Sequence, residues 1–83
     1  GERDAIDDIV RHVTGAAPAA IGFRDGEQGR VALVTITLPG DQPLPSAHRH
    51  AGAIEESVRE RCPALADVIV HTEPTDAPVG SGS

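Results

Sequence analysis

The side chains of this chain that could ligate a transition metal are four histidines, one cysteine and a glutamate near the C-terminus. His71 and Glu73 stand two residues apart in a segment rich in valine and isoleucine. The period-two geometry of a β-strand puts two such side chains on the same face. Imidazole and carboxylate groups suit Zn²⁺ and its neighbours, and a carboxylate can also bridge two ions. The pair predicts a metal site on a strand, and the alternative is an ordinary polar strand end.

A second pair of histidines lies in a predicted helix. Because His48 and His50 are two residues apart, their side chains point about 200° away from each other and cannot chelate one ion together. His48 projects about 100° from the predicted buried stripe of that helix, and His50 about 60° to the other side. The side chain of His48 is therefore predicted to point toward the edge of the domain and not into the core.

His12 and Cys62 carry no predicted site. His12 falls on the wet side of a predicted helix and is interpreted as a surface residue. Cys62 stands at a predicted helix end before a proline, where it is interpreted as a small capping hydrophobe. A nucleophilic role for Cys62 lacks an identifiable orienting group or oxyanion hole, and the chain contains no Tyr or Trp. No enzyme activity is predicted.

Two helices and three strands are predicted to position these side chains. Residues 3–14 carry Ile6, Ile9, Val10 and Val13 at helical spacing. Residues 19–24 and 30–38 predict a hairpin around a turn at 25–29, and residues 67–72 predict a strand that Glu73-Pro74 closes. A helix is predicted from Pro45, as its first residue, to Arg61, with a buried stripe of Ala47, Ala51, Ile54 and Val58. This order predicts an α+β sandwich with two helices on one face of a three-stranded sheet.

The other face of the predicted sheet needs a cover. Residues 31–38 are apolar or β-branched on both faces, which is more than a half-exposed strand requires. A chain of 83 residues with one aromatic residue builds a thin core, and its one cysteine cannot form an internal disulfide. These features predict a homodimer through the helix-free face or an edge of the sheet.

Charge and hydropathy exclude several classes of partner. Thirteen acidic residues against seven basic ones give a net charge of −6, which is poorly suited to neutralising phosphates, so no nucleic-acid partner is predicted. No apolar stretch is long enough for a membrane span, so this segment is not expected to insert into a bilayer. No signal peptide is expected, because no basic region precedes an apolar one, and a lone cysteine suits the reducing cytoplasm at least as well as secretion. Residues 1–2 and 75–83 are predicted to be flexible ends outside the fold.

Three segments resemble the C-terminal cytoplasmic domain of the cation diffusion facilitator (CDF) transporters. They are PLPSAH at residues 43–48, IEESVRERCP at 54–63 and DVIVHTEP at 67–74. In that family the helix opens with an Ala-His pair, and the last strand ends in Val-x-Val-His-x-Glu/Asp-Pro. Both motifs occur here at the family's separation, and the resemblance covers about residues 3–74.

The resemblance implies a ferredoxin-like, metallochaperone-like fold that pairs as a V-shaped homodimer. The full-length protein would carry a transmembrane domain that exports Zn²⁺ or a similar ion, with this soluble domain on the cytoplasmic side of the inner membrane. Metal at or near the dimer interface would bias the transport cycle by linkage. The family's helix histidine matches His48, its strand histidine matches His71, and its adjacent acid matches Glu73.

This sequence also departs from the family's pattern. Some members place further histidines where this chain has Thr35 and Ala19 or Ala20, so the number of ions per dimer stays open. His50 is the secondary candidate for a replacement ligand. Zn²⁺ is the expected ion, and the donor set also admits Cd²⁺, Mn²⁺, Fe²⁺, Co²⁺ and Ni²⁺.

Two other functions fit the same fold. The first is a purely structural homodimerisation module whose histidines bind no metal at cellular concentrations. The second is a regulatory domain of ferredoxin-like topology that binds a small organic molecule. The response of the domain's stability to added ligand separates the three functions. A metal sensor is stabilised by Zn²⁺, a small-molecule sensor by an organic ligand, and a structural module by neither.

Overall fold

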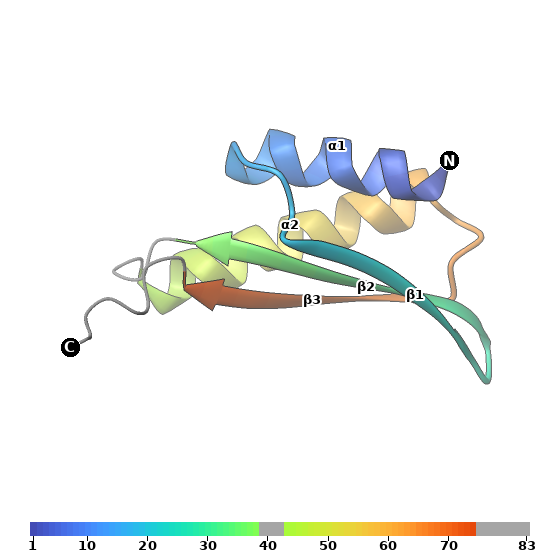
Figure 1. The fold of residues 1–83 in the computed structure, drawn as a ribbon. Coiled ribbons are helices and arrows are strands. Elements are labelled where there is room, and N and C mark those ends of the chain that lie inside the picture. The colour runs from blue at the N-terminus through green and yellow to red at the C-terminus, as the bar shows by residue number, and fades with distance from the viewer. Residues whose placement is uncertain (39–42, 75–83) are drawn as a thin grey trace.

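Two helices pack on one face of a three-stranded sheet, as the sequence predicts (Figure 1). The computed structural model describes residues 1–38 and 43–74. The sheet order is β1-β2-β3, with β1 antiparallel and β3 parallel to the central strand β2. The elements in chain order are α1 (Glu2–Thr14), β1 (Ala20–Gly26), β2 (Gly29–Leu38), α2 (Leu44–Arg61) and β3 (Asp67–Pro74).

Helix α1 forms because its apolar residues recur at helical spacing. Ile6, Ile9 and Val10 are buried on the face that points to the sheet. The helix ends at Gly15, whose φ of 81° is left-handed and whose N–H donates to the carbonyl of Arg11 at 2.8 Å. The predicted end of this helix is therefore confirmed.

The β1–β2 hairpin is tied to the start of α1. β1 runs to Gly26 and β2 begins at Gly29, so the turn is shorter than the predicted 25–29 segment. Arg30 lies over the ring of Phe23, with its guanidinium carbon 4.4 Å from the ring centroid. The same guanidinium donates to the carboxylate of Glu2 at 3.3 Å. Glu2 belongs to the helix, which begins one residue earlier than predicted.

Helix α2 follows its prediction with two differences. It begins at Leu44, so Pro45 occupies the second helical position and not the first. Its predicted buried stripe is unevenly buried: Ile54 and Val58 are fully buried, whereas Ala47 and Ala51, nearer the start of the helix, are half-buried.

Cys62 ends α2 as the predicted capping hydrophobe. Its N–H donates to the carbonyl of Val58 at 2.8 Å, and its thiol side chain is 4% exposed. The cysteine therefore belongs to the core and not to a surface.

Strand β3 continues further than predicted. We expected Glu73-Pro74 to close the strand after Thr72, and this expectation is wrong. Among the described strands, β3 pairs with β2 alone and is an edge strand. Proline is tolerated at a sheet edge because its missing N–H is not needed there. Glu73 therefore keeps the alternation of the strand and shares a face with His71.

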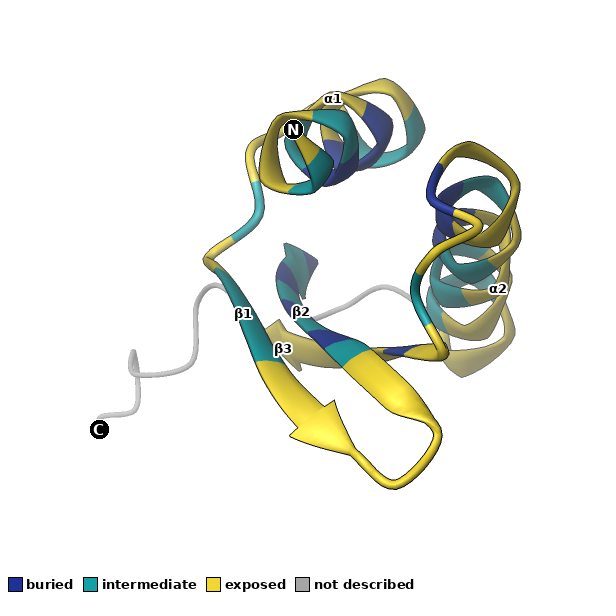
Figure 2. Cartoon of the chain, turned by 90° about the vertical axis from the view of Figure 1, so that its right-hand side faces the viewer, coloured by how far each residue is buried: buried dark blue, intermediate teal, exposed yellow. Residues whose placement is uncertain are grey.

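The two faces of the sheet differ in cover. On β2 the side chains that point to the helices are buried, and they are Ala32, Val34, Ile36 and Leu38. Their neighbours on the opposite, helix-free face are only half-buried, and they are Val31, Leu33, Thr35 and Thr37. Both helices lie on the same side of the sheet (Figure 2). The predicted tail at 75–83 lies outside the described residues.

We expect Ile54→Ala to destabilise the domain by about 2–5 kcal/mol, because the substitution opens a cavity at a side chain with no exposed surface. Urea unfolding followed by circular dichroism measures the change. Leu44→Ala in the same helix is the control: Leu44 is 66% exposed, so its truncation should cost less than about 0.5 kcal/mol. Equal losses for both variants would contradict the observed core.

The pKa of Asp67 lies below its usual value. The backbone N–H of Val68 donates to the carboxylate at 2.8 Å, and the guanidinium of Arg59 donates to it at 3.2 Å. A depressed pKa stabilises the folded state above the unfolded-state value of about 3.9, and this contribution is lost as the pH falls through the folded-state pKa.

We expect Arg59→Gln to raise the pKa of Asp67 partway back, because the Val68 N–H remains as a donor. An NMR titration of the side-chain carboxyl carbon measures this shift. Arg49→Gln, another exposed arginine of α2, is the control and should leave the titration unchanged. An unshifted Asp67 in the Arg59 variant would contradict the role of the guanidinium.

Candidate metal centre

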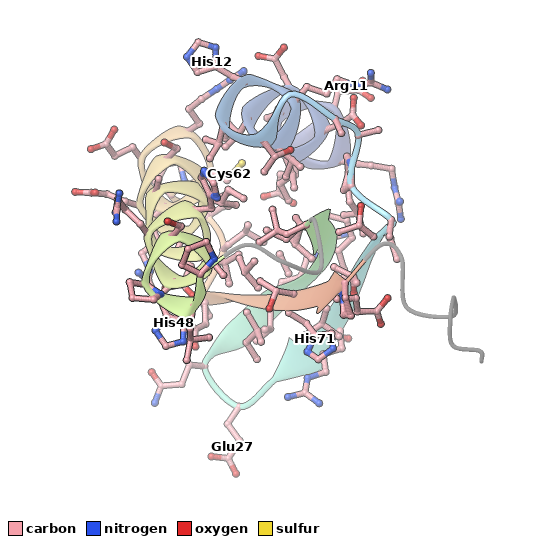
Figure 3. The ribbon with its side chains drawn as sticks, turned by 90° about the vertical axis from the view of Figure 1, so that its left-hand side faces the viewer. Arg11, His12, Glu27, His48, Cys62 and His71 are labelled. Carbon is pink, nitrogen blue, oxygen red and sulfur yellow. The ribbon has the colours of Figure 1, made fainter. Side chains whose placement is uncertain are left out.

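Strand β3 brings His71 and Glu73 together on the helix-free face. The Nε2 atom of His71 lies 3.8 Å from the Oε2 atom of Glu73, and the two side chains are 68% and 53% exposed. Figure 3 shows His71 projecting from β3 on the side of the sheet away from α1. A protonated imidazole would form an ion pair with the carboxylate. A neutral imidazole would leave one nitrogen and one carboxylate oxygen close enough to bind the same ion. The predicted convergence of the two side chains is present in the structure.

His48 lies at the same end of the domain but in a different layer. It stands in the first half of α2 and is exposed. The start of α2 and the C-terminal end of β3 lie at one end of the molecule (Figure 1), while His48 comes from the helical layer and His71 from the opposite face of the sheet (Figure 3). His48 and the pair therefore come from different layers of the domain.

The described residues of one protomer do not form a complete site. Across residues 1–38 and 43–74, no group of three or more His, Cys, Asp or Glu side chains is close enough to hold one ion. Zinc takes four ligands in structural sites, so His71 and Glu73 leave positions that other groups must fill. The role of His48 as a third ligand stays a prediction that depends on a second chain.

The remaining candidates lie elsewhere. His50 is half-buried on α2. His12 is exposed on α1 and lines a surface cavity of about 320 Å³ between the two helices, as does Arg61, whose guanidinium pairs with Asp8 at 3.2 Å. Cys62 is buried, so its thiol is not presented to an ion at the helix-free face.

Sequence reasoning missed two neighbours of the pair. In the parallel register of β2 and β3, Thr35 is paired with His71 and Thr37 with Glu73. The sequence marks Thr35 only as a departure from a family pattern. Strand pairing joins residues far apart in the chain, so no local signal could have found these neighbours.

The comparisons with known proteins identify the family. Residues 2–75 match the model of the cation efflux protein, cytoplasmic domain. This chain belongs to that family. It is a family of transporter domains and not of enzymes. A search of curated proteins finds no match.

Solved structures of the C-terminal domain of MamM share the fold. A copper form of a single-residue variant of that domain is 17% identical, with 89% of this chain and 94% of that chain covered and a TM-score of 0.76. A fragment of the same domain is also 17% identical, with 89% and 95% covered and a TM-score of 0.76. The likeness confirms the predicted metallochaperone-like fold. Neither described helix is long and apolar enough to cross a membrane.

Proposed function

We propose that this domain pairs two copies of a divalent-cation efflux transporter and binds Zn²⁺ or a related ion where they meet. The single observation that carries the proposal is the convergence of His71 and Glu73, 3.8 Å apart, on the face that neither described helix covers. Two solvent-exposed ligand atoms form only part of a metal site, and a second copy of the chain could supply the missing ligands.

The donor set fits a borderline divalent ion. Imidazole and carboxylate groups are ligands for Zn²⁺, and Cd²⁺, Mn²⁺, Fe²⁺, Co²⁺ and Ni²⁺ accept the same groups. The buried thiol of Cys62 offers no soft ligand at this face, which disfavours Cu(I). When bound, the ion would be held by His71 and Glu73, with His48 as the proposed further ligand and His50 as the secondary one.

The apolar part of the same face supports the homodimer. Ile69 on β3 is 44% exposed, and Val31 and Leu33 on β2 are only half-buried. Covering these side chains with a second copy would remove apolar surface from water, which favours association. The ligand pair stands on the same face further along β3, so metal binding and pairing involve one surface.

This arrangement gives the domain a regulatory role in the full-length transporter. An ion that takes ligands from two copies binds their closed arrangement better than their open one, and it shifts the population by that difference in affinity. The transmembrane domain of the same protein, which would lie in the membrane, would sense the closure. The domain itself would lie on the cytoplasmic side.

The second candidate function is a structural homodimerisation module. It is favoured by the observation that no three ligating side chains gather within the described part of one protomer. In that case the apolar face would pair the copies, and the histidines would bind no metal at cellular concentrations.

We expect Zn²⁺ to bind the native domain saturably in a calorimetric titration, and the double variant His48→Ala/His71→Ala to lose this binding. His71→Ala alone should weaken binding because it removes one of the two converging ligand atoms. His12→Ala is the matched control: this exposed histidine lies on α1, away from β3, and its removal should change nothing.

Thermal unfolding with and without Zn²⁺ gives a second measurement. A ligand at 100 times its dissociation constant adds about 2.7 kcal/mol to the free energy of unfolding. If the native protein shows no saturable binding, or if the double variant binds Zn²⁺ as the native protein does, the metal-binding part of the proposal is contradicted. The structural module is then favoured.

We expect Ile69→Glu to convert a native dimer into a monomer in sedimentation experiments, because it buries a charge in the apolar part of the interface. Ala53→Glu adds the same charge to the exposed surface of α2 and should leave the dimer intact. A native chain that sediments as a monomer, or an Ile69→Glu variant that remains dimeric, would contradict pairing through this face.

A further inference from the structure

We infer that Thr35 and Thr37 are positioning residues that hold His71 and Glu73 in the orientations needed to ligate an ion. The inference rests on the proposed function, because it concerns the same site. It adds two residues of β2 to a site that the sequence places on β3 and α2.

The register of the two strands carries the first step. Thr35 pairs with His71 and Thr37 with Glu73, so each threonine stands directly beside one ligand. Adjacent strands lie about 4.8 Å apart, which leaves a threonine hydroxyl within reach of a neighbouring imidazole or carboxylate. All four side chains point to the helix-free face, since their neighbours on β2 are the buried residues that face the helices.

The chemistry of the face changes at the same level on both strands. Toward the N-terminal ends of the two strands this face is apolar: β2 carries Val31 and Leu33, and β3 carries Ile69 beside Leu33. Toward their C-terminal ends the face is polar, because threonine hydroxyls on β2 accompany the imidazole and carboxylate on β3. A purely packing role would be served equally well by valine at both threonine positions, because valine has the same shape and also favours strands.

The partner on the other side of Thr35 offers no competing polar side chain. In the antiparallel register Thr35 stands opposite Ala20, and its backbone carbonyl accepts the N–H of Ala19 at 2.8 Å. Within the described residues neither threonine hydroxyl makes a hydrogen bond. Both hydroxyls are therefore available to the ligands beside them.

A hydroxyl beside each ligand has a definite task. An imidazole that ligates through one nitrogen carries a proton on the other, and the Thr35 oxygen can accept it. The Thr37 O–H can donate to a carboxylate oxygen of Glu73. These bonds would fix the tautomer of His71 and the rotamers of both exposed ligands, which otherwise lose conformational freedom when they bind.

The test compares Thr35→Val with Thr35→Ser in calorimetric titrations with Zn²⁺. Valine keeps the shape and removes the hydroxyl, whereas serine keeps the hydroxyl. We expect Thr35→Val to weaken binding about 10-fold, in line with the loss of an outer hydrogen bond to a ligand, and Thr35→Ser to stay close to the native affinity. Thr37→Val should behave as Thr35→Val does.

Thr72→Val is the matched control. Thr72 stands between the two ligands in sequence but is paired with the buried Ile36, so it points to the opposite face. Its variant should bind Zn²⁺ as the native chain does. The absorption spectrum of the Co²⁺-loaded protein, which reports ligand geometry, should change in Thr35→Val and not in Thr72→Val.

The outcomes separate this inference from the proposed function. If the native chain binds Zn²⁺ and Thr35→Val and Thr37→Val bind it equally well, the threonines position nothing and only this inference is overturned. Equal weakening in Thr35→Val, Thr35→Ser and Thr72→Val would also overturn it, because the effect would then come from strand packing. If the native chain itself binds no Zn²⁺, the proposed function falls and this inference with it.

Discussion

The one-sided burial of the central strand is the constraint on which the rest of this structure depends. Both helices cover the same face of β2, where Ala32, Val34 and Ile36 are almost completely buried. A shift of one residue would exchange the two faces of the strand, so this burial fixes which side chains point away from the helices. The same burial fixes β3 through Val68, which is 3% exposed and paired with Ala32. The place of His71 and Glu73 on the uncovered face follows from that register.

Local periodicity was enough to predict most of the fold. The stripe around Ile6 and Val10 predicts α1 over residues 3–14, because the helical spacing is a signal carried by the element itself. The end of β3 was not predictable in the same way. A strand can include Pro74 only if the strand lies at an edge of the sheet, and the position of a strand is a property of the assembled sheet. The parallel pairing of β2 with β3 is nonlocal for the same reason.

The candidate site, too, has features that the sequence can predict and features that only the assembled structure shows. The convergence of His71 and Glu73 could be predicted because it needs only the period of one strand. The neighbours Thr35 and Thr37 needed the register of two strands, and the relation of His48 to the pair needs the placement of two layers and of a second chain. Family membership supplies the class of protein, a cation efflux domain, but the choice among divalent ions depends on the completed set of ligands.

The described residues of one protomer supply only part of a metal site, and a partial site is what the proposed regulatory role requires. A ligand with equal affinity for two states shifts nothing, however tightly it binds. A protomer that held three or four ligands by itself would bind an ion equally well in the open and the closed dimer, and the transporter would receive no signal. Here the two converging side chains, His71 and Glu73, share the helix-free face with the exposed Ile69, so in the proposed function one surface would both complete the site and pair the copies. In the proposed dimer, affinity for the ion would depend on association, and by reciprocity association would depend on the ion.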